Sequence, residues 1–179
     1  DVVEKAAALP LIAHPGTRWN YSIATDVLGY LVEVVCGMPF ERYLVEKVIK
    51  PLKMADTDFY VPEAKHKRLA ANYSHDGKGG LALIDDPAKS RYLRPRTVNS
   101  GGGGLVSTLD DYLLFCRALL NRGELGGARL IGPKTLQLMT TNHLPGGRDL
   151  TEMSRAMFSE ASYAGVGFGL GFAITMDPA

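Results

Sequence analysis

The sequence has few of the features that mark specialised classes of protein. Two cysteines in 179 residues are too few for a disulfide-rich scaffold. Lysine and arginine total 20 against 19 acidic residues, and this net charge of +1 gives no electrostatic case for binding nucleic acid or an anionic membrane. No apolar run reaches the roughly 18 residues that a membrane-spanning helix needs. There is no signal peptide at Asp1 and no long internal repeat, so the sequence is not that of a solenoid.

The composition is that of a globular domain. Hydrophobic residues make up 46% and charged residues 22%, and 179 residues suffice for one domain with a sizeable core. Twenty glycines and ten prolines indicate a chain rich in turns. The sequence has no initiator methionine, opens on a helix-like stretch and stops just after a strand-like one. We therefore expect it to be a piece of a longer polypeptide.

Common catalytic and metal-binding motifs are also absent. Without Gly-x-Ser-x-Gly or a P-loop, an α/β-hydrolase and a nucleotide-binding site are not supported. The four histidines form no His-x-x-x-His pair, and the two cysteines, Cys36 and Cys116, are far apart, so zinc has weak support. Both cysteines are expected to be buried thiols, and the histidines to be loop or surface residues. We expect no metal and no organic cofactor.

The hydrophobic pattern predicts several helices. The first ends at Gly37 and is capped by Ser22 or Thr25; its expected apolar face is Val27, Leu28, Leu31, Val34 and Val35. A second helix has Pro39 in its first turn, stops at Pro51, and has the face Phe40, Tyr43, Leu44 and Val48. A third is capped by Ser107 or Thr108 and ends at residues 121–123; its expected buried face is Leu109, Tyr112, Leu113, Cys116, Leu119 and Leu120. Pro133 starts a further helix through Met139.

The remaining segments are less regular. Residues 59–61 and 70–73 are predicted as short strands, and residues 75–80 as a turn. Two basic clusters, at residues 65–68 and 89–96, are interpreted as solvated faces, although an arginine of the second can line the mouth of a substrate site. From Gly165, glycines alternate with apolar residues, which is typical of a strand whose bare face is closely covered by another element.

Four ordered segments carry a family resemblance. They are His14-Pro-Gly-Thr-Arg-Trp-Asn-Tyr-Ser22, the segment from Phe40 to Met54 with Pro-Leu-Lys-Met at its end, Ser100-Gly-Gly-Gly-Gly-Leu-Val-Ser-Thr108, and Gly165 to Phe172. Together they resemble the serine β-lactamase-like superfamily, which includes class C β-lactamases, D-alanyl-D-alanine carboxypeptidases and family VIII carboxylesterases. The resemblance runs across nearly the whole chain.

The resemblance implies a catalytic role for Tyr21. In this family a Ser-x-x-Lys motif supplies the nucleophile and a lysine, a Tyr-x-Asn motif supplies a tyrosine, and a strand such as Lys-Thr-Gly closes the site. Tyr21 matches the tyrosine. A phenol has a pKa of about 10, and a neighbouring ammonium favours its phenolate, which can then take the proton of the serine and return it to the leaving group. Trp19 is expected to be a core anchor for this loop.

The chain departs from the family pattern at three places. Ile23 stands where β-lactamases and peptidases usually carry an asparagine that binds the substrate amide, and this shifts weight towards ester hydrolysis. No serine is followed three positions later by lysine, and Lys134-Thr135 is followed by Leu136 within a predicted helix. We therefore expect the nucleophile upstream of Asp1 and the closing strand downstream of Ala179, so this chain alone should be inactive.

The resulting expectation is an α+β fold of the β-lactamase/transpeptidase-like kind. Residues 1–162 are expected to be its helical region and residues 163–179 the start of the return to the antiparallel sheet, within one domain. The chain is expected to be part of a serine hydrolase that acts through an acyl-enzyme, most simply a carboxylesterase. The alternatives are a β-lactamase or D-alanyl-D-alanine carboxypeptidase, and a non-catalytic ligand-binding homologue. The expected partners are a small ester, β-lactam or peptide substrate and the remaining segments of the same protein, with no nucleic acid and no membrane span. In addition to the catalytic candidate Tyr21, Gly101 and Gly102 are candidate substrate-binding residues.

Overall fold

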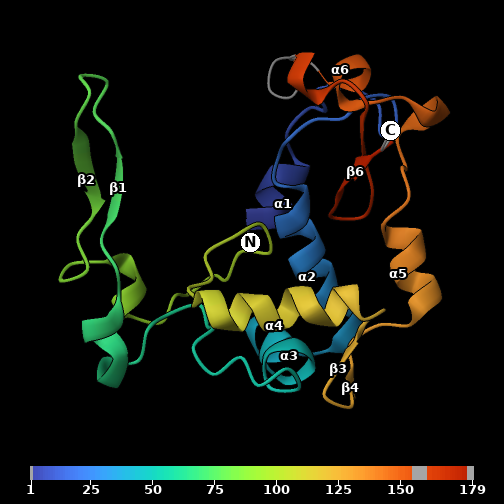
Figure 1. The fold of residues 1–179 in the computed structure, drawn as a ribbon. Helices are drawn as coiled ribbons and strands as arrows, with labels where there is room; N and C mark the ends of the chain where they lie inside the picture. Colours follow the sequence, from blue (N-terminus) through green and yellow to red (C-terminus); the bar gives the residue numbers. More distant parts are fainter. Residues whose placement is uncertain (1, 155–160, 177–179) are drawn as a thin grey trace.

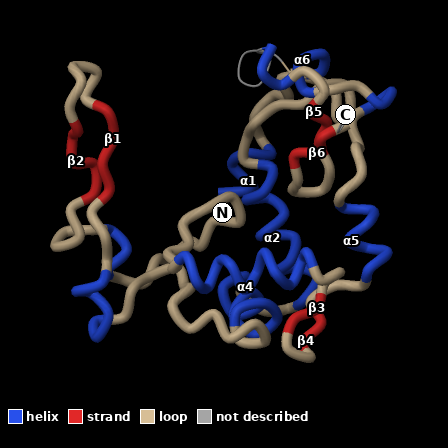
Figure 2. Tube along the Cα trace, viewed as in Figure 1, coloured by secondary structure: helices blue, strands red, loops and turns tan. Residues whose placement is uncertain are grey.

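The computed structural model describes residues 2–154 and 161–176, and it combines helices with short antiparallel strands (Figures 1 and 2). The α-helices are α1 Val2–Ala7, α2 Ala24–Cys36, α3 Phe40–Leu44, α4 Leu109–Leu120, α5 Pro133–Met139 and α6 Leu150–Met153. The other helical turns are η1 Val45–Ile49, η2 Glu63–Arg68, η3 Arg91–Leu93, η4 Pro145–Gly147 and η5 Ala161–Tyr163. The strands form three antiparallel hairpins: β1 Asn72–His75 with β2 Leu81–Asp85, β3 Glu124–Leu125 with β4 Ala128–Arg129, and β5 Val166–Phe168 with β6 Ala173–Thr175. The expected α+β class is confirmed.

Local signals end and begin the helices where the sequence predicts. Gly37 ends α2 with φ +63°, and its N–H donates to the Glu33 carbonyl oxygen at 2.9 Å. Thr108 caps α4, its hydroxyl accepting from the Asp111 N–H at 3.2 Å. Pro133 opens α5 as predicted. The predicted cap of α2 is wrong, because Ile23 occupies that position and makes no side-chain cap hydrogen bond.

The segment after α3 continues as a turn of π-helix, η1. The Lys50 N–H donates to the Val45 carbonyl oxygen at 2.9 Å, and Pro51, which has no N–H, follows directly. This turn brings Ile49 and Leu52 against Ala118 of α4 in the first core cluster. The members of that cluster are Ile49, Leu52, Met54 and Ala118, with Leu44, Val45, Val48, Leu114, Phe115, Leu125 and Leu130 packed against it.

A second core cluster lies at the other end of the molecule. Its members are Leu144, Leu150 and Met153, with Trp19, Tyr163, Val166 and Phe168 packed against it. The Trp19 and Phe168 rings meet edge to face with centroids 5.1 Å apart. This confirms the expectation that Trp19 anchors its loop.

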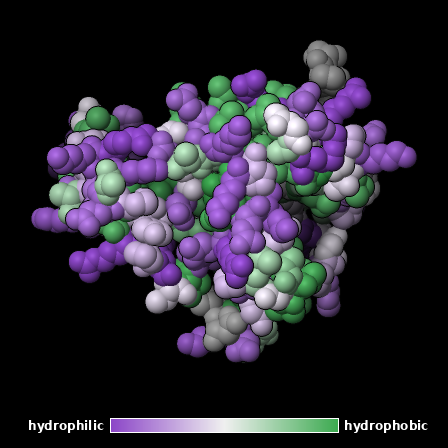
Figure 3. Space-filling view, turned by 90° about the horizontal axis from the view of Figure 1, so that it is seen from below, coloured by the Kyte–Doolittle hydropathy of each residue, from purple (hydrophilic) through white to green (hydrophobic). Residues whose placement is uncertain are grey.

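The predicted apolar face of α2 is exposed, and the predicted buried face of α4 is wrong. On α2 the exposed fraction runs from 39% at Val27 to 74% at Val35. On α4 the expected face is largely exposed too, and Leu114, Phe115 and Ala118 pack inward instead. Because α4 carries apolar residues around most of its circumference, their spacing fits either face. Hydrophobic side chains accordingly reach the surface among polar ones, as they do in several places on the face drawn in Figure 3.

Other local expectations are corrected as well. Residues 59–61 form no strand, since Phe59 is buried in an irregular segment beside the isolated bridge from Asp58 to Val106. Cys36 is exposed rather than buried, because it stands on the last turn of α2, and Cys116 is partly buried; both are free thiols. No helix in the described part of the chain combines the length and apolar character that a membrane crossing requires.

The glycine-rich C-terminal segment is a hairpin rather than one strand. Strand β5 turns at residues 169–172 and pairs with β6, with Gly167 opposite Ile174. The covered bare face is confirmed at two of its four glycines: a Cβ on Gly167 would lie 2.5 Å from the Asn142 side chain, and one on Gly169 would lie 2.2 Å from the Met139 carbonyl oxygen, whereas nothing lies within 4 Å of one on Gly165 or Gly171. Glycine at 167 and 169 permits this close approach of the end of α5 and the residues after it.

Candidate active site

Tyr21 is held by the loop between α1 and α2. Gly16, with φ +78°, makes the turn that precedes it, and the Thr17 hydroxyl donates to the His14 carbonyl oxygen at 2.7 Å. Further along, the Trp19 N–H donates to the Met153 carbonyl oxygen at 3.2 Å, which ties the loop to the second core cluster. Tyr21 therefore lies two residues after the anchored Trp19, on a loop that is tied to the core.

The Tyr21 side chain opens onto a hollow. It is 70% exposed and lines a depression of about 730 Å³ together with Ile23, Asp26, Arg96 and Gly102; we call this depression the tyrosine hollow. The Tyr21 and Trp19 rings lie 6.2 Å apart, centroid to centroid. A phenol in this position is accessible to a small molecule.

The two glycines predicted at the site lie differently. Gly102 lines the tyrosine hollow with Gly103 and Gly104. Gly101 instead faces α2, where a Cβ would stand only 2.2 Å from the Thr25 carbonyl oxygen. Gly102 thus lines the same hollow as Tyr21, whereas Gly101 packs the glycine run against α2.

Both ends of the glycine run are fixed by hydrogen bonds. Before it, the Ser100 hydroxyl donates to Asp26 Oδ1 at 2.5 Å and accepts from the Gly102 N–H at 3.0 Å. After it, Val106 and Asp58 exchange backbone hydrogen bonds of 2.8 and 3.1 Å. Sequence reasoning missed Asp26, whose position in the first turn of α2 becomes informative only when Ser100 is known to face it.

Arginines give the hollow a positive side. Arg91 and Arg96, both in the second basic cluster, line it. Arg91 lies over the Tyr92 ring, 5.0 Å from its centroid, and donates to the Tyr92 hydroxyl at 2.9 Å; this hydrogen bond raises the pKa of the guanidinium. Asp26 is the acidic residue among those that line the hollow.

The hollow contains no residue that fits the family's nucleophile. Its two serines are Ser22 and Ser100, which are followed three positions later by Thr25 and Gly103 rather than by lysine. None of the described residues that line it is a lysine. Lys134, in the first turn of α5, lines a different depression with Phe172. The described residues supply a tyrosine, a glycine wall and cations, but no activated serine.

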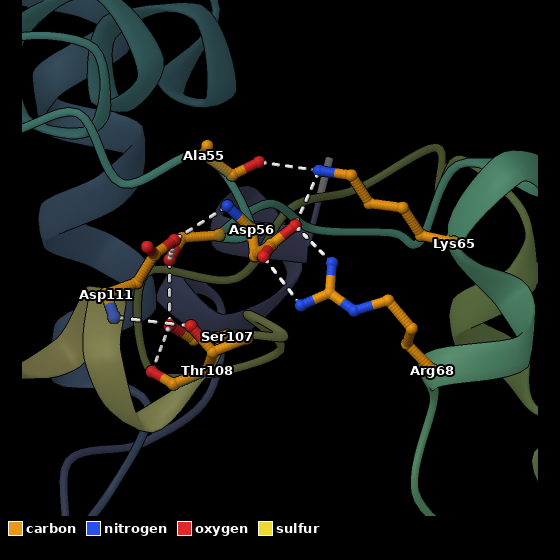
Figure 4. Close-up of polar contacts among 8 residues, drawn as sticks. Ala55, Asp56, Lys65, Arg68, Ser107, Thr108 and Asp111 are labelled. Atoms are coloured by element: carbon orange, nitrogen blue, oxygen red, sulfur yellow. Dashed lines mark hydrogen bonds and ion pairs between the residues drawn. The ribbon is translucent and has the colours of Figure 1, made fainter.

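A second polar cluster is centred on Asp56, which pairs with two of the basic residues 65–68, while Lys67 and Arg68 are exposed as the interpretation of a solvated face predicts (Figure 4). Asp56 accepts two hydrogen bonds from the Arg68 guanidinium, at 2.8 and 2.7 Å, and pairs with Lys65 Nζ at 2.7 Å. These cations hold the pKa of the Asp56 carboxyl well below its usual range, the hydrogen bond from Arg68 being the largest cause. Lys65 Nζ also donates to the Ala55 carbonyl oxygen.

The same cluster extends to the first turn of α4. The buried Asp111 carboxylate accepts from the Asp56 N–H at 2.7 Å and from the Thr57 hydroxyl at 2.8 Å, and Thr57 and Ser107 share a further hydrogen bond (Figure 4). Every group in this network is engaged within the chain. It joins η2 to α4 and is a structural element rather than a site. No group of three histidine, cysteine or acidic residues suited to a metal ion occurs in the described part of the chain.

Comparison with known proteins identifies relatives along the whole chain. Residues 1–177 match the family model described as Beta-lactamase. Protein Rv1367c of Mycobacterium tuberculosis is 38% identical over 97% of this chain and 42% of its own length. Esterase EstB of Burkholderia gladioli is 33% identical over 65% of this chain and 33% of its own length. The chain thus spans less than half the length of these relatives.

Solved structures agree with the sequence relatives. EstCE1, a hydrolase with promiscuous acyltransferase activity, has a TM-score of 0.74 and 30% identity, over 96% of this chain and 44% of its own. Simvastatin synthase (LovD) from Aspergillus terreus has a TM-score of 0.76 and 26% identity, over 95% and 43%. The expected β-lactamase/transpeptidase-like fold is confirmed, and the chain belongs to the β-lactamase family.

Proposed function

We propose that this chain is part of a serine hydrolase that cleaves esters through an acyl-enzyme, with Tyr21 as the proton-transfer residue. The observation that carries the proposal is the placement of the exposed Tyr21 side chain and Gly102 on one hollow. The nucleophilic serine and its lysine are proposed to come from sequence outside residues 1–179, because no Ser-x-x-Lys motif occurs within them.

The proposed reaction has two steps. The serine oxygen attacks the ester carbonyl while its proton passes to the Tyr21 phenolate, and the alcohol then leaves with that proton. Water next attacks the acyl-serine, giving up a proton to the same phenolate, which returns it to the serine oxygen as the acid departs. An ammonium next to Tyr21 is needed to favour its phenolate at neutral pH.

Ile23 favours esters over amides. It lines the tyrosine hollow and is 48% exposed, so an apolar side chain stands where an amide-binding asparagine is usual in β-lactamases and peptidases. The sec-butyl side chain of isoleucine offers no donor to a substrate amide. The similarity to proteins named esterase EstB and lovastatin esterase (Penicillium rubens) supports the same class. By this proposal the substrate is a small or short-chain ester. In the proposed domain, residues 1–162 form the helical region and residues 163–179 form the start of the return to the antiparallel sheet.

The test is made in the full-length gene product. Tyr21→Phe should lower kcat for para-nitrophenyl butyrate by about a hundred- to ten-thousand-fold, the range for loss of a positioned acid–base group. Tyr73→Phe is the matched control, because Tyr73 is also exposed but stands on β1. Unchanged turnover in Tyr21→Phe would overturn the proposal.

A chromogenic cephalosporin separates the alternatives. The family description favours a β-lactamase as the second candidate. Turnover of the cephalosporin with a kcat/KM above that for the ester would replace the esterase assignment. Binding without turnover of either compound would point to a non-catalytic homologue.

A further inference from the structure

We propose that the esters taken by this site carry a carboxylate group, and that Arg96 recognises it. This inference deepens the proposed function and depends on it. It names a substrate class, acid-bearing esters, that follows from the charges around Tyr21 rather than from the tyrosine itself.

The position of the Arg96 guanidinium is the first observation. Its Nη1 atom lies 3.8 Å from the point where a Cβ on Gly104 would stand, so the cation lies beside the glycine wall of the tyrosine hollow. Arg96 also lines a neighbouring depression of about 780 Å³ that Ile23 and Asp26 share with the first. The guanidinium therefore stands where the two depressions meet.

The second observation is that Arg96 is uncommitted. Within residues 2–154 and 161–176, its guanidinium has neither a hydrogen bond nor an ion pair to another residue. By contrast, the Arg68 guanidinium pairs with Asp56, and that of Arg42 pairs with Glu46. A guanidinium presents five N–H donors in a planar fork that matches a carboxylate, and none of the described residues accepts from those of Arg96.

The third observation is the balance of charge around the hollow. Arg91 and Arg96 face it with one acid, Asp26, whose Oδ1 already accepts from Ser100. Arg91 keeps its position through the Tyr92 ring and hydroxyl. The charged groups that line the tyrosine hollow sum to +1, which favours an anionic ligand there. The neighbouring depression instead has Glu33 and Glu41 with Asp26 against Lys5 and Arg96, so the carboxylate is assigned to the tyrosine hollow.

The test compares matched esters in the full-length protein. The first pair is the para-nitrophenyl monoester of adipic acid and para-nitrophenyl hexanoate, which share leaving group and chain length but differ in a carboxylate on the acyl chain. The second pair, meta-carboxyphenyl acetate and its methyl ester, places the carboxylate on the alcohol. We expect the acid to be preferred in one pair, which also identifies the side of the ester that faces Arg96.

Arg96→Gln should lower that preference, measured as the ratio of kcat/KM values, by about fivefold, the effect of one partly solvated ion pair. Arg94→Gln is the control: Arg94 belongs to the same cluster and is exposed, but it is not among the residues that line the hollow. The preference should also fall between 0.1 M and 1 M salt, where the screening length drops from about 10 Å to about 3 Å.

The outcomes separate the two proposals. Tyr21-dependent hydrolysis with no preference in either pair, or a preference unchanged in Arg96→Gln, overturns the carboxylate inference and leaves the esterase proposal standing. Absence of Tyr21-dependent hydrolysis of all four esters overturns the proposed function, and the inference with it.

Discussion

The Ser100 hydroxyl donates to Asp26 Oδ1 at 2.5 Å across 74 residues of sequence. This contact joins the first residue before the glycine run to the helix that follows Tyr21. Since Ser100 also accepts from the Gly102 N–H, one hydroxyl orients the glycine wall relative to the tyrosine. The distance between Tyr21 and Gly102 across the hollow therefore depends on a pair of residues that need not touch substrate.

This pair predicts an energetic coupling between the two segments. Asp26→Ala and Ser100→Ala should each destabilise the protein, and the double variant should cost less than their sum by about 1.5 kcal/mol, as for a hydrogen bond to a charged group. Denaturant unfolding of the four proteins gives the coupling. Strict additivity of the two changes would show that the contact contributes nothing.

The glycine run predicts a position-specific effect of a single methyl group. In Gly101→Ala the new Cβ would meet the Thr25 carbonyl oxygen at 2.2 Å, so the run must move away from α2, and both stability and esterase activity should fall. Gly103→Ala is the control, since nothing lies within 4 Å of a Cβ there and its φ is not positive. Equal effects of the two substitutions on melting temperature would contradict this packing.

Asp56 predicts a pH-dependent contribution to stability. Its pKa is lowered by Arg68 and Lys65, so its contribution is complete above the ordinary carboxyl pKa of about 4 and is lost as pH falls towards the lower folded pKa. Asp56→Asn should therefore destabilise the protein at pH 7, and the difference from the wild type should shrink steadily below pH 4. Urea midpoints measured from pH 7 to pH 2.5 test this. A difference that grows on acidification would reverse the sign and refute the assignment.

Asp111 and its neighbour Asp110 form a natural comparison on α4. Asp111 is buried and accepts from the Asp56 N–H and the Thr57 hydroxyl, whereas Asp110 is exposed on the same turn. Asp111→Ala leaves these donors without an acceptor and should cost about 2 kcal/mol more than Asp110→Ala. Both variants lose one acidic charge near the start of the helix, so the difference isolates the buried hydrogen bonds. Similar unfolding midpoints for the two would argue against the network in Figure 4.

Local chemistry made part of the fold predictable from sequence. Gly37, Thr108 and Pro133 act within one turn of chain, and each begins or ends its helix as predicted. The buried side of α4 was not predictable, because apolar residues surround that helix and only its neighbours select a face. The buried but irregular segment at Phe59 shows the same limit, since its course is set by Val106 and other distant residues.

The site divides in the same way. Tyr21 and Gly102 became candidate site residues through a family resemblance. Their proximity in the structure depends on contacts between segments some eighty residues apart. Arg96 was anticipated only as one arginine of a basic cluster, since nothing in its spacing distinguishes it from Arg94. Asp26 was missed because its partner, Ser100, is remote in sequence.

The hairpin of β1 and β2 stands apart from the labelled α-helices in Figures 1 and 2, and its side chains, Asp85 excepted, are exposed. Its strands pair antiparallel, with Tyr73 opposite Leu83, and none of its residues belongs to either core cluster. This arm can therefore lengthen, shorten or exchange its residues at little cost to the rest of the molecule. Variation between homologues should concentrate there, and a tag or fluorophore inserted near Gly77 should leave ester turnover intact.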